Sequence, residues 1–238
     1  MSYAKLSWNT DTYNRFLQDL QALADPQYKA FHARLCKTSR AEILGVRMPD
    51  TKRIAKEIAK GDADAFLALC GDTYYEELLI KGFVLGFQKK PLFEKRENLD
   101  AFVLQIDNWA VCDGFCAALK PKQTEYPYLY DWCCTLLQTT GEYTRRTAIV
   151  LLMDYLLRDE YIDRVLVQLQ TVPCNCYYVC MAVAWCLSMS FVKYREKTLA
   201  LLLENAFDKE THNKAIQKCI DSFRVSAEDK AYLRTLKR

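Results

Sequence analysis

A tryptophan and an aspartate stand four residues apart in the segment 106–113, which reads IDNWAVCD. If a helix begins at Asn108, Trp109 and Asp113 lie on one face of it, with the indole in the first turn. A carboxylate beside an aromatic plane can stabilise positive charge on a substrate, or orient and deprotonate a water molecule, while the ring attracts cations. The same spacing also fits a core tryptophan beside a carboxylate that is hydrogen-bonded to a neighbouring helix.

Two further residues occupy positions where their type needs an explanation. Arg146 begins an otherwise apolar run, and Trp185 lies in the middle of an apolar segment. Arg146 could pair with Asp113 or hold a phosphate through two hydrogen bonds. Trp185 fits simple core packing, or a contact surface if its helix faces a concave groove.

Other kinds of site have little support in the sequence. The chain contains no G-x-x-x-x-G-K-[ST] and no G-x-G-x-x-G motif, and its histidines are His32 and His212 alone, far apart in sequence. Its eleven cysteines are odd in number and mostly lie in apolar helical segments, and the close group Cys174, Cys176 and Cys180 contains no C-x-x-C pair. We therefore expect free thiols, no metal site and no cofactor.

The elements that carry these residues are predicted to be helices. The chain has 238 residues, 51% of them hydrophobic and 26% charged, which is enough for a sizeable core. Its 7 glycines and 6 prolines are too few for the many tight turns of an all-β fold. Capping residues and an apolar 3.6-residue period mark the helix starts. The fourteen predicted helices lie near residues 10–24, 26–37, 49–60, 62–70, 73–88, 91–105, 108–119, 126–139, 142–157, 160–171, 175–190, 194–205, 208–222 and 226–236.

Short connections make consecutive helices antiparallel neighbours. Residues 146–157 and 178–191 are apolar around most of the helix circumference, which predicts inner helices covered on one side by more amphipathic ones. This layering is typical of helix-pair solenoids of the HEAT or armadillo kind, here as a single domain over residues 1–238. Because no strict sequence period is present, a compact helical bundle is the alternative.

Charge and hydropathy restrict the partners. The net charge of +3 arises in the second half of the chain, and residues 193–238 hold 11 basic against 7 acidic side chains. This bias fits either a polyanion-binding surface or ordinary solvated helix faces. No run approaches the roughly 18 apolar residues of a membrane span, and the first residues have no apolar signal region. We therefore expect a cytoplasmic protein with no membrane partner.

Over residues 10–235 the chain resembles the HEAT-like-repeat DNA alkylation repair proteins, the AlkD-like DNA glycosylases. The segments that carry the resemblance are GVRMPDTKRIAKEI, YEELLIKGFVLGF, IDNWAVCDGFCAALK, EYTRRTAIVLLMDYLL, YYVCMAVAWCLS and NKAIQKCIDSFRVS. Glycosylases of this family carry a W-x-x-x-D pair, an arginine in an R-T-A-I segment and a second tryptophan near an A-x-A-W segment. In this sequence the matching residues are Trp109, Asp113, Arg146 and Trp185.

The resemblance implies an all-α, right-handed solenoid of antiparallel HEAT-like helix pairs with a concave, basic groove for double-stranded DNA. It also implies a monomeric hydrolase of base excision repair, working at the bacterial nucleoid, that excises cationic N3- and N7-alkylated purines. Asp113 would stabilise the oxocarbenium-like sugar and position a water molecule. Trp109 and Trp185 would line the nucleotide, and Arg146 would hold a phosphate or fix Asp113. We add Arg145, the neighbouring cation, to the predicted DNA-binding residues.

Two alternatives use the same kind of fold without this chemistry. One is a non-catalytic HEAT-repeat protein that binds particular DNA structures, and the other is a protein-binding helical scaffold. A large apolar patch on the concave side would favour the scaffold.

Overall fold

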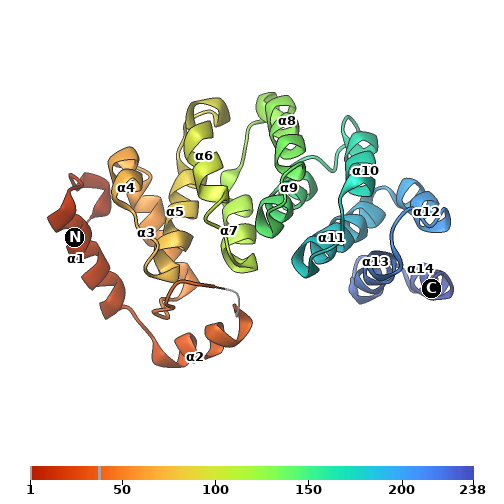
Figure 1. Ribbon diagram of the computed structural model, residues 1–238, viewed down its shortest axis with the longest axis horizontal. Helices are drawn as coiled ribbons and strands as arrows, with labels where there is room; N and C mark the ends of the chain where they lie inside the picture. The colour runs from red at the N-terminus through yellow and green to blue at the C-terminus, as the bar shows by residue number, and fades with distance from the viewer. Residues whose placement is uncertain (1, 37–38) are drawn as a thin grey trace. The chain divides into compact units, whose positions relative to one another are not determined.

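The computed structural model describes residues 2–36 and 39–238, and over these ranges the chain is all-α, with fourteen α-helices and no named strand (Figure 1). A single parallel bridge joins Glu42 and Tyr74 in the described chain. The helices form two compact units, an N-terminal unit (Met1–Pro121) and a C-terminal unit (Lys122–Arg238).

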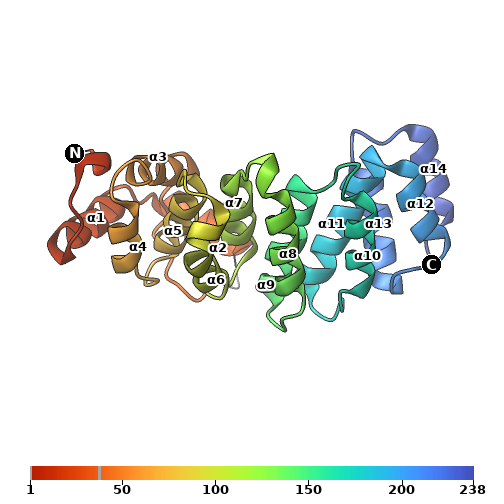
Figure 2. The same cartoon turned by 90° about the horizontal axis from the view of Figure 1, so that it is seen from above.

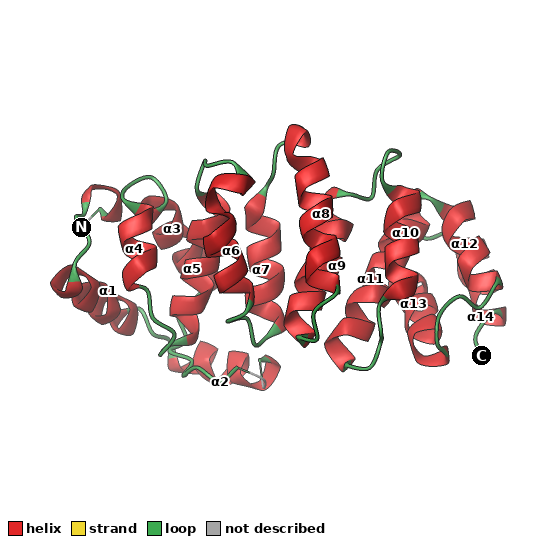
Figure 3. Cartoon of the chain, turned by 45° about the horizontal axis from the view of Figure 1, so that its top comes forward, coloured by secondary structure: helices red, strands yellow, loops and turns green. Residues whose placement is uncertain are grey.

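The N-terminal unit contains one row made of every second helix. Its helices are α1 (Thr10–Ala22), α2 (Pro26–Leu35), α3 (Met48–Ile58), α4 (Ala63–Leu69), α5 (Tyr75–Phe87), α6 (Arg96–Val103) and α7 (Trp109–Leu119). Helix α5 lies between α3 and α7 and packs against both. Helices α4 and α6 also contact α5, and Figure 3 shows them in front of the row.

The C-terminal unit repeats this arrangement. Its helices are α8 (Tyr126–Leu137), α9 (Glu142–Tyr155), α10 (Ile162–Thr171), α11 (Tyr177–Lys193), α12 (Arg195–Leu203), α13 (Lys209–Asp221) and α14 (Ala227–Thr235). Helix α11 packs between α9 and α13, as Figure 2 also shows. Helices α8, α10 and α12 form a second row that is connected by side chains. The Arg164 guanidinium of α10 lies 3.9 Å from the ring centroid of Tyr130 on α8, and Lys197 of α12 forms an ion pair with Asp163 of α10.

All fourteen predicted helices are present, with small differences at their ends. The predicted helix 91–105 begins as a 3-10 turn over Leu92–Lys95 before α6. The break falls at Lys95, whose buried ammonium donates to the carbonyl oxygens of Leu85 and Gln88 at 2.7 and 3.3 Å. The last residue of the predicted helix 26–37 lies outside the described residues.

The two strongly apolar segments are inner helices, as predicted. In α9 every residue from Tyr143 to Met153 is buried, and ten residues of α11 are buried. Burial around most of α11 follows from its packing between two neighbours, and removing apolar surface from water stabilises the fold by roughly 25 cal/mol per Å². No helix in the described chain is both long and apolar enough to cross a membrane.

The eleven cysteines are all free thiols, and eight of them are buried. Burial raises the pKa of Cys36 and Cys174 to about 11 and the pKa of Cys219 to about 12. Among the described residues no three histidine, cysteine or acidic side chains are grouped so that they could hold a metal ion.

Two glycines let α5 approach its neighbours closely, Gly86 toward α7 and Gly82 toward α6. A Cβ atom at Gly86 would lie 2.6 Å from the Cβ of Ala118 and 2.8 Å from its carbonyl carbon. A Cβ atom at Gly82 would lie 2.7 Å from the ring of Phe102. Because the obstacle at Gly86 is the backbone of α7, no rotamer change can make room for a larger residue.

We expect Gly86→Ala to lower the free energy of unfolding by about 1–3 kcal/mol, although alanine is the better helix former. Gly114→Ala is the matched control on the facing helix, since the nearest atoms to its Cβ would be side-chain atoms, the Phe83 ring at 3.3 Å and Leu79 Cδ1 at 3.6 Å. Urea titrations of both variants measure the difference. Equal stability of Gly86→Ala and the wild type would contradict the backbone contact.

Candidate functional site

The predicted Trp109 and Asp113 lie at the start of α7, where the sequence placed them. Asn108 caps the helix: it is fully buried, and its side-chain oxygen accepts the Val111 backbone N–H at 3.0 Å. Trp109 is the first helical residue and Asp113 follows one turn later, so the two residues share a face. Both side chains are half-buried, and neither is sealed in the core.

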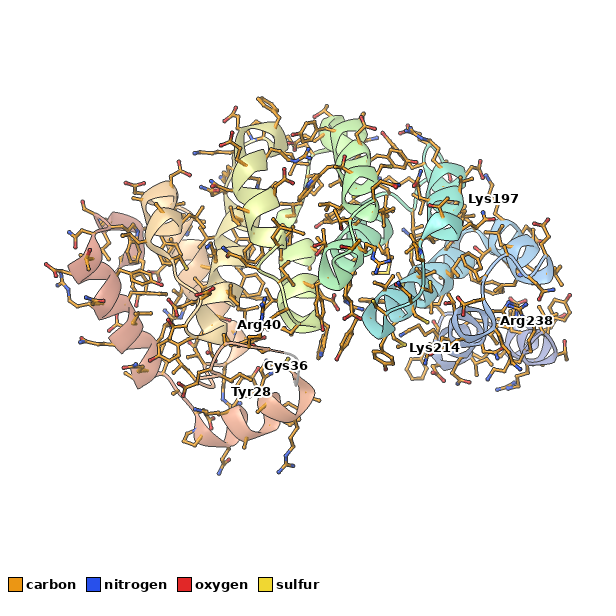
Figure 4. The ribbon with its side chains drawn as sticks, in the orientation of Figure 1. Tyr28, Cys36, Arg40, Lys197, Lys214 and Arg238 are labelled. Carbon is orange, nitrogen blue, oxygen red and sulfur yellow. The ribbon has the colours of Figure 1, made fainter. Side chains whose placement is uncertain are left out.

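The indole of Trp109 is held by α2. Its Nε1–H donates to the carbonyl oxygen of Leu35 at 3.2 Å, at the last residue of that helix. A second link joins the same regions, because Asp107 accepts the Arg40 backbone N–H at 2.6 Å. Figure 4 labels Cys36 and Arg40 in this region. The orientation of Trp109 therefore depends on where α2 lies.

Helix α2 is fixed at its other end by a buried carboxylate on α5. Glu76 is 1% exposed, and its two oxygens accept the backbone N–H groups of Leu44, Gly45 and Val46 at 2.9, 2.8 and 3.1 Å. The Gly45 carbonyl in turn accepts the backbone N–H of Asp25, the N-cap of α2. Gly45 has a φ of +97° and would clash with Asp25 if it carried a Cβ atom.

In the row α3, α5 and α7, lysines of α3 lie over aromatic rings of α5. The Lys52 ammonium lies 5.5 Å from the ring centroid of Phe83, and that ring contacts Gly114, the residue after Asp113. The Lys56 ammonium lies 5.7 Å from the centroid of Phe87, one turn along both helices. Two cations of α3 therefore lie over α5, the helix that packs against α7.

In the C-terminal unit, Arg146 of α9 binds the start of α11. Arg146 is 6% exposed, and its guanidinium donates to the Tyr178 carbonyl oxygen at 3.0 Å and lies 5.9 Å from the centroid of the Tyr178 ring. The Tyr178 ring also lies 5.3 Å from that of Tyr143. The Lys214 ammonium on α13, labelled in Figure 4, lies 5.4 Å from the Tyr177 ring. Cations and aromatic rings thus gather at the start of α11.

Trp185 lies on the one stripe of α11 that is not buried. Tyr178, Met181, Trp185 and Met189 follow each other at intervals of three or four residues and are all half-buried, whereas the residues between them are buried. Arg224 approaches the end of this stripe, since its guanidinium contacts the Met189 sulfur at 2.6 Å. Trp185 is therefore a partly accessible side chain on a stripe whose far end contacts a cation.

Arg145, the other predicted DNA-binding arginine, is directed into the protein. It is 4% exposed and donates to the Pro173 carbonyl oxygen at 3.0 Å and to Oδ1 of Asn175 at 3.1 Å. Its guanidinium also lies 3.6 Å from the Cys176 sulfur. These contacts hold the turn that precedes α11, and they give the Cys-Asn-Cys segment a structural partner.

The predicted residues fall into two groups, one in each unit. Trp109 and Asp113 share α7 of the N-terminal unit, whereas Arg145, Arg146 and Trp185 lie on α9 and α11 of the C-terminal unit.

Sequence reasoning missed three groups around these residues. Tyr178, the lysines of α3 and the anchoring carboxylate Glu76 were not predicted. A signal for the lysines exists, because residues 52, 56 and 60 repeat at helical spacing.

Comparison with known proteins agrees with the resemblance seen in the motifs. The model of the family described as DNA alkylation repair enzyme matches residues 16–218, a range that includes all five predicted site residues. No curated protein matches the chain. The family match covers most of the sequence, and its description implies DNA as the substrate. The chain therefore belongs to the DNA alkylation repair enzyme family.

Proposed function

We propose that this protein is a DNA glycosylase that excises cationic N3- and N7-alkylated purines from duplex DNA. The observation that carries the proposal is the pairing of Trp109 and Asp113 on the first two turns of α7, half-buried and beside a lysine-bearing row of helices. Family membership supplies the substrate class of damaged DNA, and the chemistry of these two side chains supplies the reaction.

Alkylation at N3 or N7 makes the purine a cationic leaving group, so no acid is needed to protonate it. As the glycosidic bond lengthens, positive charge develops at C1′ and the ring oxygen of the deoxyribose. Asp113 stabilises this charge and orients the water molecule that attacks C1′. Trp109 offers its ring face to the same cationic sugar, and the Leu35 carbonyl keeps that face in one orientation.

Arg146 and Trp185 contribute from the C-terminal unit in this proposal. Arg146, whose guanidinium donates to the Tyr178 carbonyl oxygen, holds a backbone phosphate at the start of α11, and Trp185 lines the nucleotide from the partly accessible stripe of α11. Arg145 keeps the turn before α11 in place, and we assign its effect on DNA binding to that positioning.

We also propose that the helices form a right-handed solenoid of antiparallel HEAT-like pairs with a concave DNA-binding groove. Every second helix packs in one row in each unit, α3 with α5 and α7, and α9 with α11 and α13. Such stacking of helix pairs is the construction principle of α-solenoids. One face of each row is then available to a long ligand.

We expect Asp113→Asn to reduce base release by about a hundredfold or more, because the amide keeps the shape of the side chain but removes its charge. The measurement is single-turnover release from a duplex that carries one N7-methylguanine, at fixed salt. Asp50→Asn is the control, since this exposed carboxylate of the same unit pairs with Arg53. Equal rates for Asp113→Asn and the wild type would remove Asp113 from the mechanism.

If neither protein releases base while both bind duplex DNA tightly and with strong salt dependence, the protein is a non-catalytic DNA binder. If the wild type binds no duplex, the helical-scaffold alternative is favoured.

We expect Trp109→Ala to lower both base release and duplex affinity, whereas Trp109→Phe keeps much of the affinity. Phenylalanine retains an aromatic face but cannot donate a hydrogen bond to the Leu35 carbonyl. The two variants therefore separate the ring face from its orientation when binding and release are measured side by side. A Trp109→Ala variant with wild-type release would contradict the assigned role.

A further inference from the structure

An open concavity of about 410 Å³ on the N-terminal unit is lined by Lys56, Lys60, Lys89, Phe87 and Ala59. The three lysines are exposed, and the half-buried Phe87 ring forms an apolar part of the lining. Lys56 leans over this ring. We call these three lysines, with Phe87 beneath Lys56, the lysine cradle.

The lysines of the cradle differ from their neighbours in having no acidic partner. Within residues 2–36 and 39–238, no carboxylate lies within 4 Å of the ammonium of Lys56, Lys60 or Lys89. By contrast, Arg53 on the same helix pairs with Asp50, and Lys90, the residue after Lys89, pairs with Asp64. The charges of the cradle are therefore available to an external anion.

The cradle also differs from the lysine-rich surface of the C-terminal unit. There, a concavity of about 510 Å³ is lined by Lys209, Lys214, Lys237 and other polar side chains. Lys214 pairs with Glu210 at 3.5 Å, and Lys237 donates to Gln217 at 2.7 Å. An anionic ligand would have to displace Glu210 and Gln217 before it could bind Lys214 and Lys237. Within the described part of the chain, the lysines of the cradle have no carboxylate partner that a ligand must displace.

The form of the cradle suits a polymer of phosphates. Lys52 extends it along α3, one turn before Lys56, and Lys60 follows just after the helix end, so the cations form a line. Lysine binds phosphate as a point charge from a flexible stem and demands no fixed geometry, which fits a backbone read without regard to sequence. The apolar Phe87 surface between the charges suits the sugar edge of the same strand.

We propose that the lysine cradle binds backbone phosphates of duplex DNA away from the damaged nucleotide, and that it holds damaged and undamaged DNA alike. The inference rests on the proposed DNA-binding function and adds a second contact on the N-terminal unit. The cradle raises affinity without taking part in bond cleavage, because it lies on α3 and the end of α5, while Asp113 lies on α7.

The test compares two triple variants with equal loss of charge. K56Q/K60Q/K89Q removes the cradle, and K29Q/R53Q/K90Q removes three exposed cations of the same unit that are already paired with carboxylates. Binding of a short undamaged duplex is measured over a range of salt concentrations. We expect the slope of log K against log salt to fall by about 2–3 for the cradle variant and to change little for the control, because each neutralised phosphate releases its counterions.

A charge-preserving variant and a rate measurement complete the test. K56R/K60R/K89R should restore the salt slope, and circular dichroism checks that each variant keeps its helices. At saturating protein, the cradle variant should release N7-methylguanine at the wild-type rate. A wild-type slope in the cradle variant, or an equal fall in the control, overturns the proposal.

The two proposals fail in different ways. If the wild type releases no base but the cradle variant alone loses its salt slope, the glycosylase function is wrong and the cradle stands. If the wild type releases base and the cradle variant binds duplex as the wild type does, the cradle is wrong and the glycosylase function stands.

Discussion

Buried charged side chains that bind backbone groups are the interaction on which this helical structure depends. A helix satisfies its own backbone except at its ends, and every connection between two helices leaves N–H and C=O groups that need partners. Glu76, Lys95 and Arg145 are each less than 5% exposed, and each binds two or more of these groups. Removing one partner of a buried polar contact costs about 1–3 kcal/mol for each group left unpaired. The charged groups of these residues therefore stabilise the connections between helices.

The same constraint reaches the candidate catalytic residues. Glu76 holds the loop before α3, this loop holds the N-cap of α2, and the last carbonyl of α2 holds the indole of Trp109. In the C-terminal unit, Arg145 holds the turn before α11, the helix that carries Trp185. The indole of Trp109 and the start of the helix that carries Trp185 are thus positioned by contacts that begin at a buried ion. The proposed function requires such fixed side chains, because a site that acts on a nucleotide works best when its groups are in place before the ligand arrives.

Much of the fold was predictable from the sequence, because capping residues and apolar periodicity are local signals. The same locality placed Trp109 and Asp113 on one helical face, and Asn108 caps that helix in the structure. The contacts of Arg145 and Arg146 could not be predicted from local sequence signals. They are adjacent in an apolar segment, yet Arg145 meets the turn at residues 173–176 and Arg146 meets Tyr178, contacts that only the fold creates. The excess of basic residues in 193–238 includes cations that pair with carboxylates, such as Arg195 with Asp229, whereas the proposed lysine cradle lies in a unit of nearly balanced charge, so net charge alone does not locate it.

The burial of most of the free thiols affects how this protein reacts with the alkylating agents that damage DNA. Electrophiles that methylate purines also attack sulfur, and the reactive form of cysteine is the thiolate. Because burial raises the pKa of Cys36 and Cys174 to about 11, very little thiolate is present at neutral pH, and the apolar packing around most of the other cysteines excludes the reagent itself. The eight buried cysteines and Cys174 are therefore poor targets for such electrophiles. The burial that stabilises the helical core thus also protects these thiols from electrophiles that alkylate DNA.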